Sequence, residues 1–446
     1  MKYTPVIGLE THVELATASK MFCGCSAEHF QAPPNTHTCP VCLGLPGALP
    51  VPNKRAVDWT LLLAEALQCQ LNTQSHFDRK NYFYPDLPKS YQITQYEKPL
   101  GENGQLEIAP GKIIRIRRVH LEEDTGKLQH TQIGSDRVVL VDFNRSGVPL
   151  VEIVTEPDFR SLEEVDLYVK KLQRIIRRLE ISNADMEKGS MRLEPSISLS
   201  GDEVPVPLPN DQLPPYRVEL KNINSFRFAR KALEYEIQRQ SELLTMGQKV
   251  LQQTRGWSED KNATFAQREK EGEHDYRYFP EPDIPPLEFT PEELEAIKHK
   301  IPELPYPRAV RLINQYGLSD YQADLLTENK DLADYFEKAV TTAAKNVSPK
   351  EIANWLINKK IDIAKLSPQA LLAEIASAKE TTTISDEEME RMVREVLAEN
   401  SQAVADYRKG KTQILGFLIG CMVKKIGPKA DRNAISQKLQ EKLRVS

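Results

Sequence analysis

Two glutamates and a histidine share one face of the first strand that the sequence predicts. Residues 6–15 alternate apolar and polar side chains with the period of a β-strand, so Glu10, His12 and Glu14 lie on one face. Neighbours on one face of a strand are about 6.5–7 Å apart, and long side chains at that spacing can converge on one ion. The same pattern also fits an ordinary half-exposed strand, so it does not by itself define a site.

Further acids occur on segments that also predict strands. Glu152 lies within the apolar run Val148–Val154, where an unpaired carboxylate would be costly to bury, so we expect it to meet a cation or several hydrogen-bond donors. The segment His120–Asp124 adds three acids at the end of another strand. Carboxylates with one imidazole suit Mg²⁺ or Mn²⁺ better than Zn²⁺, and such an ion most often handles nucleotide phosphates. The sequence contains neither a P-loop nor a GxGxxG motif, so an ATP site would need another kind of phosphate cradle.

Four of the six cysteines form a CxC pair followed by a CxxC pair: Cys23, Cys25, Cys39 and Cys42. This spacing predicts a structural zinc site with four thiolate ligands, in a segment of residues 21–45. A redox pair and a coincidental grouping are the alternatives. Cys69 and Cys421 stand apart from this group, and we expect them to be packing residues.

Three other segments mix basic and aromatic residues. They are residues 78–92, with Lys80 and Tyr82; residues 219–227, with Lys221; and residues 275–283, with Arg277. Such mixtures occur where bases and aromatic rings grip a nucleotide, and equally where aromatic residues pack in a core beneath solvated charges. The residues alone leave both interpretations open.

The elements expected to position these residues change in kind along the 446-residue chain. Up to about residue 290, predicted strands are interrupted by helices at 56–71, 161–181 and 226–247. They show no regular βαβ alternation, so we predict an α+β fold. A Pro-rich stretch follows at 279–293, and beyond it every segment predicts a helix. We place one domain boundary near residue 290 and a weaker one near residue 380.

Composition and charge limit the class of protein. Hydrophobic residues make up 40% of the chain and charged residues 28%, which excludes a disordered protein. No apolar run approaches the roughly 20 residues of a membrane helix, and the N-terminal residues do not resemble a signal peptide. We therefore expect a cytoplasmic protein that does not bind a membrane. The net charge is −5, yet residues 408–446 hold ten bases against two acids, a local charge of +8. That segment predicts either a contact with a phosphate backbone or a solvated helix surface.

Long motifs along the chain resemble the B subunit of the aspartyl/glutamyl-tRNA amidotransferase family. They are VIGLETHVEL, CPVCLGLPGALPVPNKRAV, FDRKNYFYPDLPKSYQITQ, HLEEDTGK, DFNRSGVPLVEIVTEPD, ELKNINSF and DYRYFPEPD. The similarity is dense from residue 1 to about residue 315, and it resumes at Asp406–Lys411 and Gly416–Gly420. Motifs of this length and order are not expected by chance.

The resemblance implies an enzyme that acts on misacylated tRNA, in a heterotrimer with an amidase (glutaminase) and a small third protein. The B component of this family uses ATP and Mg²⁺ to phosphorylate the side-chain carboxylate of Glu on tRNA(Gln) or of Asp on tRNA(Asn). Ammonia supplied by the amidase then displaces phosphate to give the amide. The implied activity is that of a carbon–nitrogen ligase with glutamine as the nitrogen donor. The alternative is a catalytically inactive tRNA-binding scaffold of the same complex.

The resemblance also implies a fold, a domain order and ligand sets. Residues 1–290 would form a glutamine synthetase-like cradle with an inserted zinc segment, residues 291–380 a helical domain, and residues 381–446 a basic tRNA-binding tail. Carried over by position, the catalytic magnesium ligands are Glu10, His12, Glu123 and Glu152, and the zinc ligands are Cys23, Cys25, Cys39 and Cys42. The candidates for contact with substrate or nucleotide are Lys80, Tyr82, Arg145, Lys221 and Arg277. The candidates for contact with tRNA are Lys409, Lys411, Lys424, Lys425 and Lys429.

The chain departs from the family pattern in three places, one of which is Gly427–Asp431, where the family usually has Gly-Lys-Ala-Asn-Pro. Gly189–Arg192 is followed by Leu193–Ser196, where the family usually has Cys-Asp-Ala-Asn, and the helical region after Trp355 is shorter than usual. These departures concern secondary contacts and tRNA recognition rather than the activity. The sequence does not decide which misacylated tRNA is the substrate.

Overall fold

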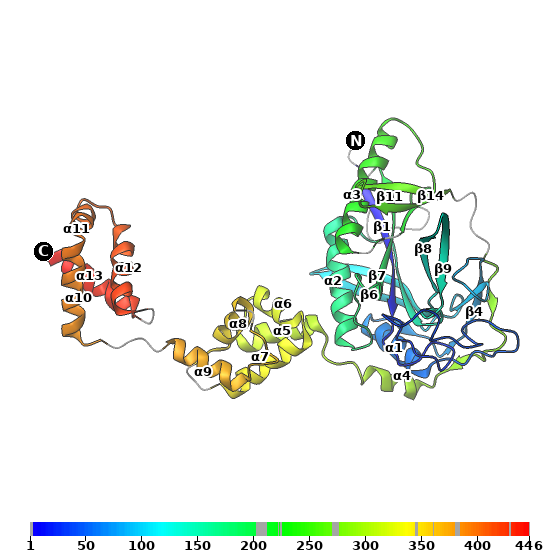
Figure 1. Cartoon of the computed structure of the whole chain (residues 1–446), viewed down its shortest axis with the longest axis horizontal. Helices are drawn as coiled ribbons and strands as arrows, with labels where there is room; N and C mark the ends of the chain where they lie inside the picture. The colour runs from blue at the N-terminus through cyan, green and yellow to red at the C-terminus, as the bar shows by residue number, and fades with distance from the viewer. Residues whose placement is uncertain are drawn as a thin grey trace. The chain divides into compact units, whose positions relative to one another are not determined.

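The computed structural model describes residues 3–201, 212–221, 223, 225–269, 276–343, 347–359, 361–379, 384–427 and 430–445. The chain forms two compact units, Met1–Pro305 and Tyr306–Ser446 (Figure 1). The first unit combines a large sheet with helices, and the described part of the second unit is helical. None of the helices within the described residues has the length and hydrophobicity that crossing a bilayer requires.

One mixed sheet organises the first unit. Its strands follow the order β14, β13, β12, β11, β1, β10, β7, β5, β4 and β15, with β6 and β2 joined beside β7. Neighbouring strands run antiparallel except β12 and β13, which are parallel. The strands are β1 (Thr4–Glu14), β2 (Gln70–Leu71), β4 (Asp78–Asn81), β5 (Tyr91–Thr94), β6 (Gly101–Ala109), β7 (Lys112–Glu123), β10 (Pro149–Thr155), β11 (Met191–Ser200), β12 (Val218–Lys221), β13 (Gln253–Ser258), β14 (Ala263–Glu269) and β15 (Phe279–Pro280). Two small antiparallel pairs lie outside it: β3 (Gln74–Ser75) with β16 (Leu287–Glu288), and β8 (Lys127–Ile133) with β9 (Asp136–Asp142).

The central strands of this sheet bring polar residues into register. Strand β1 lies between β11 and β10, and β10 lies between β1 and β7. His12 is opposite Glu152, and Glu152 is opposite His120. Residues opposite each other on neighbouring strands point to the same face of the sheet. The pairing therefore gathers histidines and carboxylates from three strands on one face.

Helices cover the other, apolar face of the sheet. They are α1 (Lys54–Ala66), α2 (Leu162–Arg178) and α3 (Phe226–Thr245), which contact β7, β6 and β11 respectively. Their apolar side chains share one buried core with Leu9, Val151 and Leu121 from the sheet. Helix α2 begins as its sequence predicts, because the Ser161 side chain accepts a hydrogen bond from the backbone N–H of Glu164.

The first unit extends beyond the boundary expected near residue 290. Helix α4 (Pro291–Lys298) packs Leu294 and Ile297 into the core of the first unit, which ends at Pro305. The Pro-rich stretch before α4 thus lies within a unit, although its composition is typical of a linker.

The second unit contains two separate buried cores. Helices α5 (Pro305–Tyr316), α6 (Asp320–Thr327), α7 (Lys330–Thr342), α8 (Pro349–Asn358) and α9 (Pro368–Lys379) supply residues to the first. Helices α10 (Asp386–Glu399), α11 (Ser401–Arg408), α12 (Ile414–Ile426) and α13 (Arg432–Val445) supply residues to the second. The boundary expected near residue 380 lies outside the described residues, between these two groups.

Candidate functional site

The polar face of the central strands opens into a cavity of about 650 Å³. Its acidic wall is formed by Glu10 of β1, Glu122 of β7 and Glu152 of β10, with His120 beside them. Basic and aromatic side chains form much of the remaining wall: Lys80, Tyr96, Arg118, Lys221, Tyr276, Arg277 and Tyr278. The cavity therefore combines acids that could hold a cation with basic and aromatic side chains.

Two acids of this wall, Glu122 and Glu152, and the adjacent His12 have the spacing of ligands to one ion. The Nε2 atom of His12 is 3.5 Å from Oε2 of Glu152 and 3.7 Å from Oε1 of Glu122. One ligand atom from each of these residues lies within 4.8 Å of the other two. Ligands about 2.1 Å from an octahedral ion are about 3 to 4 Å apart. The donor set, one imidazole and two carboxylates, therefore fits Mg²⁺ or Mn²⁺ in both chemistry and separation.

Electrostatic coupling keeps Glu152 ionised. Burial opposes ionisation of Glu152, but the imidazoles of His120 and His12 outweigh burial and hold its pKa well below the usual value. Burial likewise opposes the charge on His12, yet the Glu152 carboxylate outweighs it and raises the pKa of His12 to about 9. For Glu10, burial and then the Glu152 carboxylate raise the pKa to about 7. Glu152 and a protonated His12 therefore compensate each other in the absence of a metal, and a cation bound to the His12 imidazole would take the place of its proton.

Glu123 does not lie beside His12 and Glu152, so the structure does not bring all four predicted magnesium ligands together. Its Oε1 atom is 2.6 Å from Nζ of Lys89 and accepts the backbone N–H of Ile93 at 3.0 Å. It lines a separate cavity of about 220 Å³ next to Cys23 and Cys42. Because side chains alternate along a strand, a shift of one residue moves the carboxylate to the other face. Glu122 takes the place predicted for Glu123.

The alternation from His120 could have identified Glu122 from the sequence. His120 and Glu122 are two residues apart on β7, so they share the face that carries Glu152. Position-by-position comparison with the family motif assigned the adjacent glutamate instead.

The candidates for nucleotide or substrate contact divide between two places. Lys80, Lys221 and Arg277 line the acid-walled cavity. The ring of Tyr82 lies 6.2 Å from that of Tyr276, a residue of the cavity wall. Arg145 lies outside the described lining of this cavity and donates hydrogen bonds to the carbonyls that follow β7, at 3.0 and 2.8 Å. It also lies 3.6 Å from Oδ2 of Asp124, so it braces a turn and pairs with an acid outside this cavity.

The unusual residue Glu194 lies at the edge of the same site. It is opposite Glu10 in the pairing of β1 with β11, and its Oε2 atom accepts a hydrogen bond from Nζ of Lys221 at 2.8 Å. Burial opposes ionisation of Glu194, but Lys221 outweighs it and lowers the pKa of this carboxyl. The departure from the family pattern at this position thus exchanges Asp for the longer Glu, whose carboxylate engages a candidate cavity lysine.

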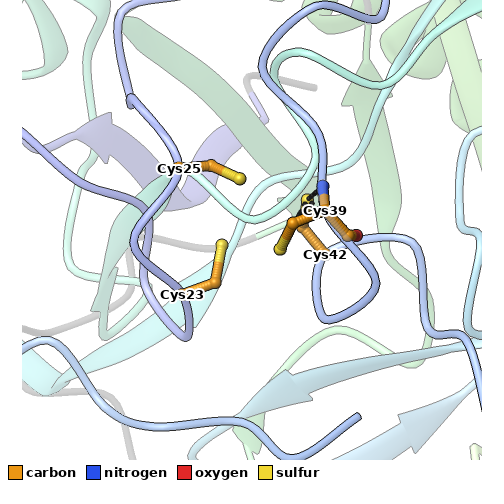
Figure 2. A group of neighbouring side chains, drawn as sticks. All are labelled: Cys23, Cys25, Cys39 and Cys42. Atoms are coloured by element: carbon orange, nitrogen blue, oxygen red, sulfur yellow. Dashed lines mark hydrogen bonds between the residues drawn. The ribbon is translucent and has the colours of Figure 1, made fainter.

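The four clustered cysteines come from two loops and point toward one another (Figure 2). Their Sγ atoms lie within 4.8 Å of one another, and those of Cys39 and Cys42 are 3.9 Å apart. A tetrahedral zinc ion with Zn–S bonds of about 2.3 Å holds its sulfurs about 3.8 Å apart. A hydrogen bond from Cys23, with a further contribution from Lys20, lowers the pKa of Cys42 to about 4. The geometry and the readily formed thiolate both fit a metal centre.

Several basic residues of the tail are paired with acids of the tail itself. Lys425 lies 3.3 Å from Glu395 and 2.7 Å from Glu399, both on α10. Lys411 pairs with Asp406 at 3.3 Å. The remaining candidates are Lys409 and Lys424, which are exposed, and Lys429, which lies outside the described residues. The acidic helix α10 therefore offsets part of the positive charge that the sequence places after residue 408.

Comparison with known families gives two matches within the chain. The GatB/GatE catalytic domain matches residues 5–295, and the GatB domain matches residues 363–443. The first match contains the acid-walled cavity and the cysteine cluster, and the second contains the basic tail up to residue 443.

Comparison with curated proteins gives relatives along nearly the whole chain. The chain is 43% identical to the B subunit of the aspartyl/glutamyl-tRNA(Asn/Gln) amidotransferase of Thermomicrobium roseum, with 99% of both chains covered. The proteins of the same name from Carboxydothermus hydrogenoformans and Thermotoga maritima are 44% and 43% identical, with at least 99% coverage of each chain. The first alignment spans 494 residues against the 446 of this chain, so the relative contains segments that this chain lacks.

Proposed function

The chain belongs to the family of aspartyl/glutamyl-tRNA(Asn/Gln) amidotransferase B subunits, and from this premise we propose that its acid-walled cavity performs the ATP-dependent half of the amidation. The family works as a multi-subunit amidotransferase in protein biosynthesis, so the chain acts as one component of a ligase complex. The observation that supports the proposal most strongly is the convergence of His12, Glu122 and Glu152.

The chemistry requires that a carboxylate be made reactive. The side-chain carboxylate of Glu on tRNA(Gln), or of Asp on tRNA(Asn), is a poor electrophile because its leaving group would be oxide. Its oxygen attacks the γ-phosphorus of ATP, which breaks the bond to ADP and gives an acyl phosphate. Ammonia then attacks the acyl carbon, phosphate leaves, and the amide forms with loss of a proton to solvent. Carbon–nitrogen ligation is thus driven by phosphoryl transfer.

The chain's own residues position the reactants in this scheme. His12, Glu122 and Glu152 would hold a Mg²⁺ ion, with Glu10 on the same face of β1. Bound there, the ion would neutralise charge on the phosphates and on the attacking carboxylate. Lys80 and Arg277, in the same wall, can bind phosphate oxygens. The strands hold this set rigidly, which favours a defined line of attack.

Ammonia must come from a partner in this scheme. Within the described residues, the four cysteines that could act as nucleophiles form one cluster, and their geometry suits a metal better than catalysis. We therefore assign ammonia production to the amidase partner, assisted by the small third protein of the complex. A glutamine synthetase-like cradle, as the resemblance implies, would receive the acyl end of the tRNA.

A tRNA-binding scaffold without catalysis is the alternative function. The grouped charges disfavour this alternative. Gathering three carboxylates and two histidines on one face of the sheet costs free energy, and a scaffold gains nothing from it. Reconstitution with the partner proteins tests the choice. We expect hydrolysis of ATP that requires both Mg²⁺ and misacylated tRNA, and tRNA binding without any such hydrolysis would favour the scaffold.

We propose that the cysteine cluster binds one structural zinc ion. Elemental analysis of the purified chain should find about one zinc per chain, because four thiolates close the tetrahedral shell. Changing Cys42 to Ser should lower the zinc content to a small fraction of that value. The Cys69→Ser variant, which alters a buried cysteine outside the cluster, is the control and should retain its zinc. Full zinc content in the Cys42→Ser variant would contradict the assignment.

We propose that exposed lysines of the tail bind phosphates of the tRNA body. A comparison of the neighbours Lys424 and Lys425 distinguishes a phosphate contact from an effect of net charge alone. Lys425 is paired with acids of α10, whereas Lys424 is exposed. The Lys424→Ala variant should bind tRNA more weakly, and the slope of log affinity against log salt should fall by about 0.7–0.9 for the lost phosphate contact. The Lys425→Ala variant should change both quantities less. Equal effects of the two variants would contradict this proposal.

A further inference from the structure

A lysine ammonium group is buried against the cysteine cluster. Lys20 is only 1% exposed. Its Nζ atom donates hydrogen bonds to the backbone carbonyls of His37 at 2.7 Å and Phe143 at 3.2 Å, and lies 3.6 Å from Sγ of Cys42. The backbone N–H of Lys20 also donates to the carbonyl of Cys25. Lys20 therefore contacts both cysteine loops and the segment that follows β9.

Two neutral carbonyls and a sulfur are an unusual set of partners for a buried ammonium. Within the part of the chain that the structure describes, no carboxylate forms an ion pair with Lys20. A buried charge without an opposite charge costs several kcal/mol even after relaxation. The arrangement is therefore favourable only if Cys42 or its cluster carries negative charge.

A four-thiolate zinc centre would supply that charge. Four thiolates around Zn²⁺ carry a net charge of −2, which is itself costly in a partly buried loop. One ammonium in contact with a ligand sulfur reduces this to −1, and N–H···S hydrogen bonds to ligands are the outer contacts that tune such centres. Lys20 and the four thiolates would each offset the burial cost of the other.

We propose that Lys20 is the built-in counter-charge of the zinc centre and a positioning residue for the ligand Cys42. This inference rests on the proposed zinc site, and goes beyond it by assigning a reason for a buried lysine outside the ligand set. The opposing interpretation is that Lys20 only ties the carbonyls of His37 and Phe143 together. The two differ in one respect: a counter-charge stabilises the zinc-loaded protein specifically, whereas a carbonyl tie stabilises the metal-free and zinc-loaded forms alike.

Two substitutions separate these roles. Lys20→Met removes both the charge and the N–H donors, whereas Lys20→Gln keeps N–H donors for the carbonyls and removes the charge. Lys54→Met is the control, since the Lys54 side chain is 86% exposed and pairs with Asp58 on the same helix. The full-length chain is purified with zinc, and a portion is stripped with a chelator.

The test is the rate of zinc transfer to a chromogenic chelator and the difference in Tm between the zinc-loaded and stripped forms. Both Lys20 variants should release zinc about 10–100-fold faster than the parent, in line with the loss of an outer contact to a metal ligand. Both should show a smaller Tm difference, while the Tm of the stripped Lys20→Gln chain stays at or above that of the stripped parent. Lys54→Met should match the parent throughout.

Other outcomes would overturn the inference in distinguishable ways. Parent-like zinc release and a parent-like Tm difference in Lys20→Gln would contradict the counter-charge, whatever the result for Lys20→Met. Lys20 would then serve only to hydrogen-bond the carbonyls of His37 and Phe143. A parent chain without zinc would refute the zinc site and the counter-charge together, while leaving the proposed cavity chemistry untouched.

Discussion

The Glu152→Gln variant should lose essentially all formation of amidated aminoacyl-tRNA while its fold stays intact. Glu152 lies between His12 and His120, and its carboxylate supplies charge that an amide cannot. Removing this charge takes away a proposed ligand and leaves the buried His120 and the half-buried His12 without their shared anion. We expect a loss of at least about 100-fold, the scale on which metal-site groups contribute to such reactions. The measurement is amide product formed from ATP, glutamine and misacylated tRNA with the partner proteins present.

Two controls make the result specific to the cavity. Glutamine hydrolysis by the partner amidase should continue in the Glu152→Gln complex, because the cavity acts on the tRNA-borne carboxylate. The Glu156→Gln variant alters a nearby glutamate that pairs with Arg117 rather than with the histidines, and it should stay within about threefold of the parent. Parent-like amidation by Glu152→Gln would exclude the proposed role of the cavity.

The second large effect is expected in stability, from the Glu236→Ala substitution in α3. Glu236 is 0% exposed, and its carboxylate receives hydrogen bonds from Arg239, Gln240 and Thr264 and lies 2.9 Å from Nε of Arg255. Alanine would leave two arginines without their anion, which costs about 3–5 kcal/mol for a buried pair. For a unit of this size we expect Tm to fall by roughly 6–15 °C. Differential scanning calorimetry measures the change.

The control for this effect lies on the same helix. Glu234 pairs with Arg230 near the surface, where its side chain is 52% exposed, so Glu234→Ala should cost less than about 1 kcal/mol. The Glu236 network joins α3 to β13 and β14, beside the strand that carries Glu219 and Lys221 of the cavity wall. Equal Tm values for the two variants would show that the network does not stabilise this part of the sheet.

The sequence predicted features that depend on local periodicity. Alternation along residues 6–15 placed Glu10 and His12 on one face of a strand, and the structure has them on one face of β1. The isolated carboxylate in an apolar run predicted partners for Glu152, and two histidines lie within 3.5 Å of it. Both inferences succeed because strand geometry and the cost of burying a charge act locally.

Features that depend on nonlocal packing were not predicted. The position of Glu122 beside Glu152 is a different case, because it follows from local alternation from His120, which motif matching did not apply. The pairing of Lys425 with α10 depends on how two helices of the tail pack, which a count of charges does not contain. Nothing in the sequence distinguishes Lys20 from a surface lysine, because its burial depends on the fold.

The residues and the resemblance contributed different parts of the functional assignment. Strand patterns and cysteine spacing indicated a magnesium site and a zinc site. They did not decide whether the protein is an enzyme or a scaffold. The long motifs named the family, and relatives at 43–44% identity along the chain support it. The identity of the misacylated tRNA does not follow from the cavity, because the reacting carboxylates of Glu and Asp differ by one methylene.

The most direct test of the proposed magnesium site is the binding of Mn²⁺ by a matched pair of variants. Glu122 and Glu123 are adjacent in sequence and point to opposite faces of β7, so exchanging each for Gln changes the same charge in two different cavities. Free Mn²⁺ is measured by electron paramagnetic resonance as the zinc-loaded chain is titrated in the presence of ATP. Our account predicts that Glu122→Gln weakens Mn²⁺ binding about 10–100-fold, whereas Glu123→Gln stays within about twofold of the parent. Weakened binding in Glu123→Gln together with parent-like binding in Glu122→Gln would contradict the account.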